Sequence, residues 1–148
     1  MSEPPDPMDD PNHPRVLVSN RQELPVDEEV LAALAGECLR GEGQARAELS
    51  VSFVTEEEMV ELHMRFTGED GPTDVLSFPL DGEDEGLRVL GDVVVCPAVA
   101  ARQGELASEL RLLLVHVILH LLGHDHEDDS DRDEMWTRQE FYTGVRVP

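Results

Sequence analysis

The stretch HVILHLLGHDH, residues 116–126, holds four of the chain's six histidines and is otherwise aliphatic apart from one glycine and one aspartate. It continues an apolar run that begins at residue 110, which predicts a buried helix over about 105–122. Burying an imidazole without a partner costs free energy. Four imidazoles in one apolar helix and the turn after it therefore need a chemical explanation.

The spacing of these histidines predicts a metal site. His116 and His120 are four residues apart, which on a helix places both rings on one face, about 6 Å apart along the axis. Gly123 stands where a left-handed residue can end the helix, so that the chain reverses and His126 returns to the same point. Three neutral imidazoles with an open fourth position are the ligand set of a catalytic zinc centre. We therefore expect one Zn²⁺ per chain.

Zinc peptidases share this spacing, but one position differs. Their pattern H-E-x-x-H-x-x-G-x-x-H has a general-base glutamate directly after the first histidine, where this chain has Val117. A zinc peptidase is therefore an alternative function, but one for which the chain lacks the general base.

His124, on the glycine turn, is a candidate catalytic residue that assists the site or shuttles a proton, or it points to solvent. Asp125 either orients a ligand's second ring nitrogen or is simply solvated.

The rest of the sequence predicts an α+β fold, a small mixed sheet covered by helices. Hydrophobic periodicity predicts strands over 15–20, 47–55, 73–80 and 88–97, and further helices over 26–40, 56–66 and 130–142. Thr55 is expected to cap the second of these helices. Residues 81–86 are expected to form an acidic turn. The last helix is expected to bury Met135, Trp136 and Phe141.

Length and composition predict one metallohydrolase domain, residues 15–148, after a disordered acidic and proline-rich tail, residues 1–14. The net charge of −22, with 33 acidic residues against 11 arginines and no lysine, excludes nucleic-acid binding through a broad basic face. Two cysteines and the lack of a secretory leader predict a reduced, cytoplasmic protein. The apolar run is shorter than the roughly 20 residues that a bilayer requires, so we expect no membrane association.

Three stretches closely resemble signature segments of the YbeY family, bacterial metal-dependent endoribonucleases and rRNA maturation factors. HVILHLLGHDH is similar to the family's H-G-x-L-H-L-x-G-Y-D-H. GPTDVLSFPL, residues 71–80, is similar to P-T-[DN]-V-L-S-F-P, and LGDVVVCP, residues 90–97, to L-G-D-I-V-I-C/S. The resemblance spans roughly residues 45–142. It implies a sheet of about four strands with a central buried metal-ligand helix, and zinc ligands His116, His120 and His126.

This resemblance implies a zinc-dependent, single-strand-specific endoribonuclease acting in small-subunit ribosomal RNA maturation and ribosome quality control. The implied partner is rRNA, bound through a local cleft, with a ribosomal protein or a GTPase as a further possibility and no DNA. Either a metal-activated water or a ribose 2′-OH could attack the phosphodiester, and the sequence does not choose between them. A metal-stabilised ribosome assembly factor without strong catalysis is the main alternative, ahead of the peptidase.

The sequence also departs from the family pattern at one position. The arginine of L-N-x-x-Y-R-G-x-D-x-P-T falls on Thr67, and Arg65 lies two positions earlier. Residues two apart on a helix face opposite ways, so Arg65 can take the catalytic arginine's place only if the helix is irregular or ending. Candidates to line the substrate cleft are Thr73, Asp74 and Ser77, each of which an ordinary polar strand face would also explain.

Overall fold

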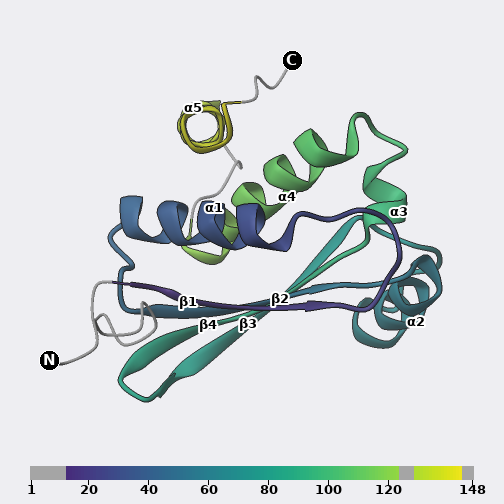
Figure 1. The fold of residues 1–148 in the computed structure, drawn as a ribbon, viewed down its shortest axis with the longest axis horizontal. Helices are drawn as coiled ribbons and strands as arrows, with labels where there is room; N and C mark the ends of the chain where they lie inside the picture. Colours follow the sequence, from purple (N-terminus) through teal and green to yellow (C-terminus); the bar gives the residue numbers. More distant parts are fainter. Residues whose placement is uncertain (1–12, 124–128, 145–148) are drawn as a thin grey trace, which may run out of the picture.

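The computed structural model describes residues 13–123 and 129–144. Its elements are β1 (Arg15–Asn20), α1 (Glu28–Gly41), β2 (Ala47–Phe53), α2 (Glu56–Thr67), β3 (Val75–Asp84), β4 (Leu87–Val95), α3 (Pro97–Ala100), α4 (Leu106–Leu121) and α5 (Asp129–Thr143). The strands form a sheet in the order β1-β2-β4-β3, in which β1, β2 and β4 are parallel and β3 is antiparallel to β4 (Figure 1). The α+β fold with a four-stranded mixed sheet is confirmed.

Helices cover both faces of this sheet. On β2, Leu49, Val51 and Phe53 are almost fully buried in the main core, as the period-two alternation predicts, and pack beneath α1 and α4. Val94 of β4 points to the other face, where it packs in a smaller cluster with Met59 of α2. Figure 1 shows α1 and α4 on one side of the strands and α2 on the other, while α5 lies outside α1 and α4.

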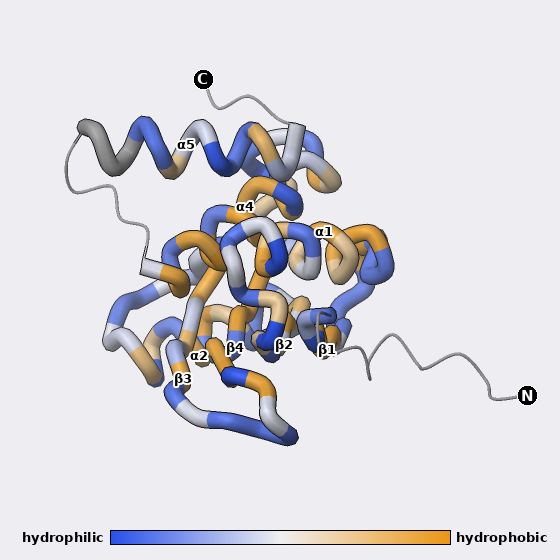
Figure 2. The backbone as a smooth tube through the Cα atoms, turned by 90° about the vertical axis from the view of Figure 1, so that its left-hand side faces the viewer, coloured by the Kyte–Doolittle hydropathy of each residue, from blue (hydrophilic) through white to orange (hydrophobic). Residues whose placement is uncertain are grey.

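The predicted buried helix is α4, which packs against α1, α5, β3 and β4. Its inward residues belong to the main core, and its tube is largely apolar in Figure 2. The buried members are Leu110, Leu114, Val115, Val117, Ile118 and Leu119. No helix in residues 13–123 and 129–144 is long and apolar enough to cross a membrane. The helix that carries His116 and His120 is therefore anchored in the main core through its apolar residues.

The structure corrects three details of the sequence prediction. Residues 81–84 continue β3, and only Glu85 and Gly86, both with positive φ, make the hairpin turn. This end of β3 is exposed at every residue, so the strand can carry acidic side chains without burying them. The short helix α3 was not predicted. Of the three α5 residues predicted to be buried, only Met135 is, while Trp136 and Phe141 are 38% and 80% exposed, because α5 packs on the layer beneath through one narrow face.

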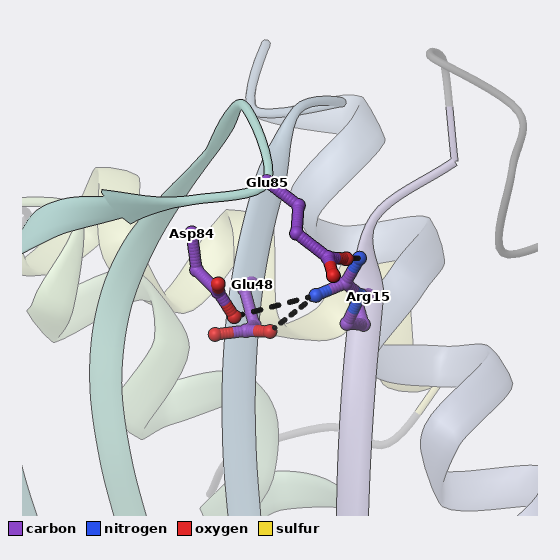
Figure 3. Close-up of polar contacts among 4 residues, drawn as sticks. All are labelled: Arg15, Glu48, Asp84 and Glu85. Carbon is purple, nitrogen blue, oxygen red and sulfur yellow. Dashed lines mark hydrogen bonds and ion pairs between the residues drawn. The ribbon is translucent and has the colours of Figure 1, made fainter.

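Arg15 connects the tip of the hairpin to the first strand (Figure 3). Its guanidinium contacts Glu48 on β2 at 3.0 Å, Asp84 at the end of β3 at 3.5 Å and Glu85 in the turn at 2.6 Å. The hydrogen bonds to Glu85, first of all, and to Glu48 raise the pKa of Arg15 above its usual value. Of the predicted tail, only His13 and Pro14 lie in the described residues, and the division into tail and domain stays a prediction.

Candidate active site

Both helical histidines lie at the carboxyl end of α4. His116 is half buried and His120, one turn later, is exposed. The helix ends at Leu121, and Gly123 has a φ of +97°, the left-handed conformation expected there. His124, Asp125 and His126 lie outside the described residues, so the set of three zinc ligands stays a prediction. Within the described residues, no three metal-ligating side chains gather.

His116 is held by a residue that the sequence analysis did not single out. Its Nδ1 lies 2.7 Å from Oε1 of Gln139 on α5, and the Gln139 side chain is buried. An amide oxygen can only accept, so Nδ1 carries the hydrogen of this bond, and in a neutral ring the lone pair is then on Nε2. The sequence held one sign of this role. Gln139 lies four residues after Met135, so a polar residue falls on the same helix face as the apolar residue predicted to be buried.

A cleft of about 320 Å³ opens beside His116. It lies where the start of β3 meets α4 and α5, three elements that are distant in sequence. Among the described residues it is lined by Asp74, Val75, Leu112, Leu113, His116 and Gln139. The structure thus brings Asp74, one of the predicted cleft residues, to the same hollow as His116.

Asp74 is fixed by contacts through both its backbone and its side chain. Its carbonyl accepts a hydrogen bond of 2.8 Å from the backbone N–H of Cys96. Its carboxylate accepts from Gln103 Nε2 at 3.2 Å and from Thr73 at 3.5 Å. Thr73 therefore supports Asp74, while Ser77 lies further along β3, on the same face as Val75. The roles of these residues in substrate binding stay predictions.

Arg65 lies apart from this cleft on α2. Its side chain is exposed, and the guanidinium carbon is 5.4 Å from the centroid of the Phe66 ring. The helix is regular through Thr67 and ends at Gly68, whose φ is +74°. Arg65 and Thr67 consequently project in different directions from the last turn of α2. That Arg65 replaces the family's arginine stays a prediction that this geometry does not favour.

The position of α5, and with it Gln139, depends on a buried carboxylate at the end of α1. Glu42 accepts hydrogen bonds from Arg138 at 2.7 Å and from the Tyr142 hydroxyl at 2.6 Å, and its side chain is only 5% exposed. Burial first, and then Glu42, raises the pKa of Tyr142. Only glycine fits at position 41, because a Cβ there would collide with the Tyr142 ring. These contacts hold α5 against the end of α1, within one turn of Gln139.

Comparison with known proteins places the chain in a family. The model of the family described as endoribonuclease YbeY matches residues 17–144. The chain belongs to the YbeY family. The endoribonuclease YbeY of Thermobifida fusca is 47% identical, with 87% of this chain and 92% of that protein covered, and that of Acidothermus cellulolyticus is 44% identical, with 89% and 92% covered.

A solved structure agrees with the family assignment. The solution structure of TM1509 from Thermotoga maritima matches with a TM-score of 0.58 at 31% identity, covering 88% of this chain and 86% of that one. The predicted YbeY family, and with it the prediction of an enzyme of the hydrolase class, is confirmed. The identity of the metal, its ligands and the site residues are not tested by these likenesses.

Proposed function

We propose that this YbeY-family chain is a zinc-dependent endoribonuclease that cleaves single-stranded RNA during small-subunit rRNA maturation and ribosome quality control in the cytoplasm. The observation that carries the proposal is the hydrogen bond from His116 Nδ1 to Gln139 Oε1 beside a cleft that also contains Asp74. A histidine whose Nδ1–H is held by a buried acceptor is the arrangement found around metal-binding imidazoles. The relatives are named endoribonucleases.

The residues present fit a zinc ion. His116, His120 and His126 would hold it, because His116 keeps its lone pair on Nε2, His120 follows one turn later, and the left-handed Gly123 lets the chain turn back after α4. When bound, zinc supplies a Lewis acid that stabilises charge on a phosphate oxygen and lowers the pKa of water. A chain with a net charge of −22 needs such a local cation to receive a phosphodiester.

Asp74 then contacts the sugar and not the phosphate. A carboxylate repels a phosphate group but accepts a hydrogen bond from a ribose hydroxyl. Gln103 and Thr73 hold the Asp74 carboxylate at the cleft, so its orientation is set before substrate arrives. Binding a ribose hydroxyl at this position favours RNA over DNA, which lacks the 2′-OH.

The structure gives a reason to prefer a nuclease over the peptidase alternative. Val117 occupies the position of the peptidase glutamate, and it is packed in the main core. A general base at this residue would have to leave the core to reach a substrate.

Arg102, a basic residue near the amino end of α4, is already paired with Glu56 at 2.6 Å. RNA contacts should therefore centre on the metal and on few arginines.

The test combines metal analysis with cleavage assays. The purified chain is expected to hold about one zinc, to cleave single-stranded RNA and to leave duplex RNA and casein intact. His120→Ala should lose both the zinc and the cleavage, because one of three ligands is removed. Equal zinc in the wild type and His120→Ala would refute the ligand assignment. Association with ribosomes without cleavage of any RNA would replace the nuclease by an assembly factor.

A further inference from the structure

Gln139 is a buried polar side chain whose position calls for an explanation. It is 4% exposed and lies on the face of α5 that packs against α4. Burying an amide costs free energy unless hydrogen bonds compensate for its desolvation, and a leucine or methionine would fill the same position without that cost. The 2.7 Å contact with His116 Nδ1 supplies such a bond.

The contact also selects the chemical form of the His116 ring. Because the amide oxygen only accepts, the hydrogen resides on Nδ1 and the lone pair on Nε2. Unlike a carboxylate, the amide cannot accept a proton from the ring or favour its charged form through an ion pair. The residue therefore fixes the tautomer and the orientation of a neutral imidazole, which is the form that binds a metal.

Three neighbouring residues on α5 anchor the helix around Gln139. Met135, one turn earlier, is fully buried in the main core. The Thr143 hydroxyl, one turn later, donates to the backbone carbonyl of Gln139 at 2.6 Å. Arg138, the preceding residue, is bound to the buried Glu42. α5 is therefore fixed at Gln139, which places the buried amide beside His116.

We propose that Gln139 is a positioning residue that sets His116 for the metal by fixing the Nδ1–H tautomer. The inference rests on the proposed function, because it assigns His116 as a ligand. It predicts that the metal bonds to Nε2 of His116 and that an acceptor at position 139 is required for tight binding. Partners of this kind typically contribute 10- to 100-fold in metal affinity.

Three variants separate positioning from packing. Gln139→Met keeps the approximate volume but removes the amide acceptor, Gln139→Glu keeps an acceptor, and Met135→Leu changes packing on the same helix face one turn away. Zinc affinity is measured by competition with a chelator. Gln139→Met should bind zinc about 10- to 100-fold more weakly than the wild type, while Gln139→Glu and Met135→Leu should stay within about threefold of it. Unchanged affinity in Gln139→Met, or equal losses in Gln139→Met and Met135→Leu, would overturn the inference.

A second readout does not depend on zinc. Imidazole ¹⁵N NMR of the metal-free protein should show His116 as a single Nδ1–H tautomer, and Gln139→Met should lose this uniformity. An Nε2–H tautomer in the wild type would overturn the positioning role even if zinc binds. If the wild type binds no zinc, the proposed function fails, and the NMR result still decides whether Gln139 sets the tautomer.

Discussion

His63 on α2 and His116 on α4 are both at least half buried on helices, yet their rings have different surroundings. His63 Nδ1 lies 2.9 Å from the Gly71 carbonyl oxygen, and its Nε2 lies 3.1 Å from a Glu69 carboxylate oxygen. Both partners only accept, so His63 meets an acceptor at each nitrogen and holds the loop after α2. His116 Nδ1 donates to the Gln139 amide oxygen, which in a neutral ring puts the lone pair on Nε2.

The difference shows why a buried histidine is not by itself evidence for a metal site. Binding a metal through His63 would break a hydrogen bond that fixes the loop leading to β3. For His116, the Gln139 contact prepares the ring as a ligand. The same amino acid on two helices of one protein is thus a loop anchor in one place and a candidate ligand in the other.

The largest expected effect separates the two histidines directly. His116→Ala should remove zinc binding and RNA cleavage, since it deletes a ligand. His63→Ala should keep about one zinc per chain and lower the free energy of unfolding by roughly 1–3 kcal/mol, because the loop loses its hydrogen bonds. Elemental analysis with urea unfolding measures both. Loss of zinc in His63→Ala, with the fold intact, would break the comparison.

The glycines that end the two helices offer a matched pair. Gly68 follows α2 with a φ of +74° and Gly123 follows α4 with a φ of +97°. Valine at either position should cost roughly 1–3 kcal/mol of stability, because a β-branched residue resists the left-handed region. Only Gly123→Val should also weaken zinc binding, since it lies between His120 and His126. Normal zinc affinity in Gly123→Val would show that the chain reversal is not needed.

The docking of α5 should matter for His116 and not for His63. Glu42→Leu leaves the Tyr142 hydroxyl without its acceptor and Arg138 with its exposed partner Glu134 alone. We expect a loss of roughly 2–4 kcal/mol in stability, because a buried pair is broken by removing one member. Zinc affinity should fall as Gln139 moves, while the His63 ring signals in an NMR spectrum stay in place. Equal disturbance of both rings would mean global unfolding.

A smaller effect concerns the two buried thiols, one in each core cluster. Burial, and then Glu42, raises the pKa of Cys38 from 9.0 to about 12, and burial also raises that of Cys96. A raised pKa in the folded state gives stability that is complete below the unfolded value and is lost as pH rises from about 9 towards 12. The slope is at most about 1.4 kcal/mol per pH unit for each thiol.

Cys38→Ala should therefore flatten the alkaline loss of stability between pH 9 and 12 more than Cys96→Ala does. Urea unfolding across this range, with each variant compared with its own stability at pH 7, provides the measurement. Identical pH profiles for the wild type and Cys38→Ala would contradict the burial of this thiol beside Glu42.

The sequence predicted the elements that depend on local pattern. The alternation in β2, the Thr55 cap, which accepts from the Glu58 N–H at 3.2 Å, and the apolar helix α4 follow from periodicity and capping chemistry. The extension of β3 and the exposure of Trp136 and Phe141 did not, since they depend on which face each element turns to its neighbours. Gln139 and Glu42 escaped notice because their roles arise only when α5 lies against α4 and α1.

The most direct test of the account is the position of the metal. Crystals of the zinc-loaded protein, measured at the zinc absorption edge, should show one anomalous peak per chain about 2.0–2.1 Å from Nε2 of His116. The same peak should be bonded to His120, and the Gln139 amide should remain on Nδ1. A peak bonded to Nδ1 of His116, or one placed at His63 and Glu69, would contradict the account.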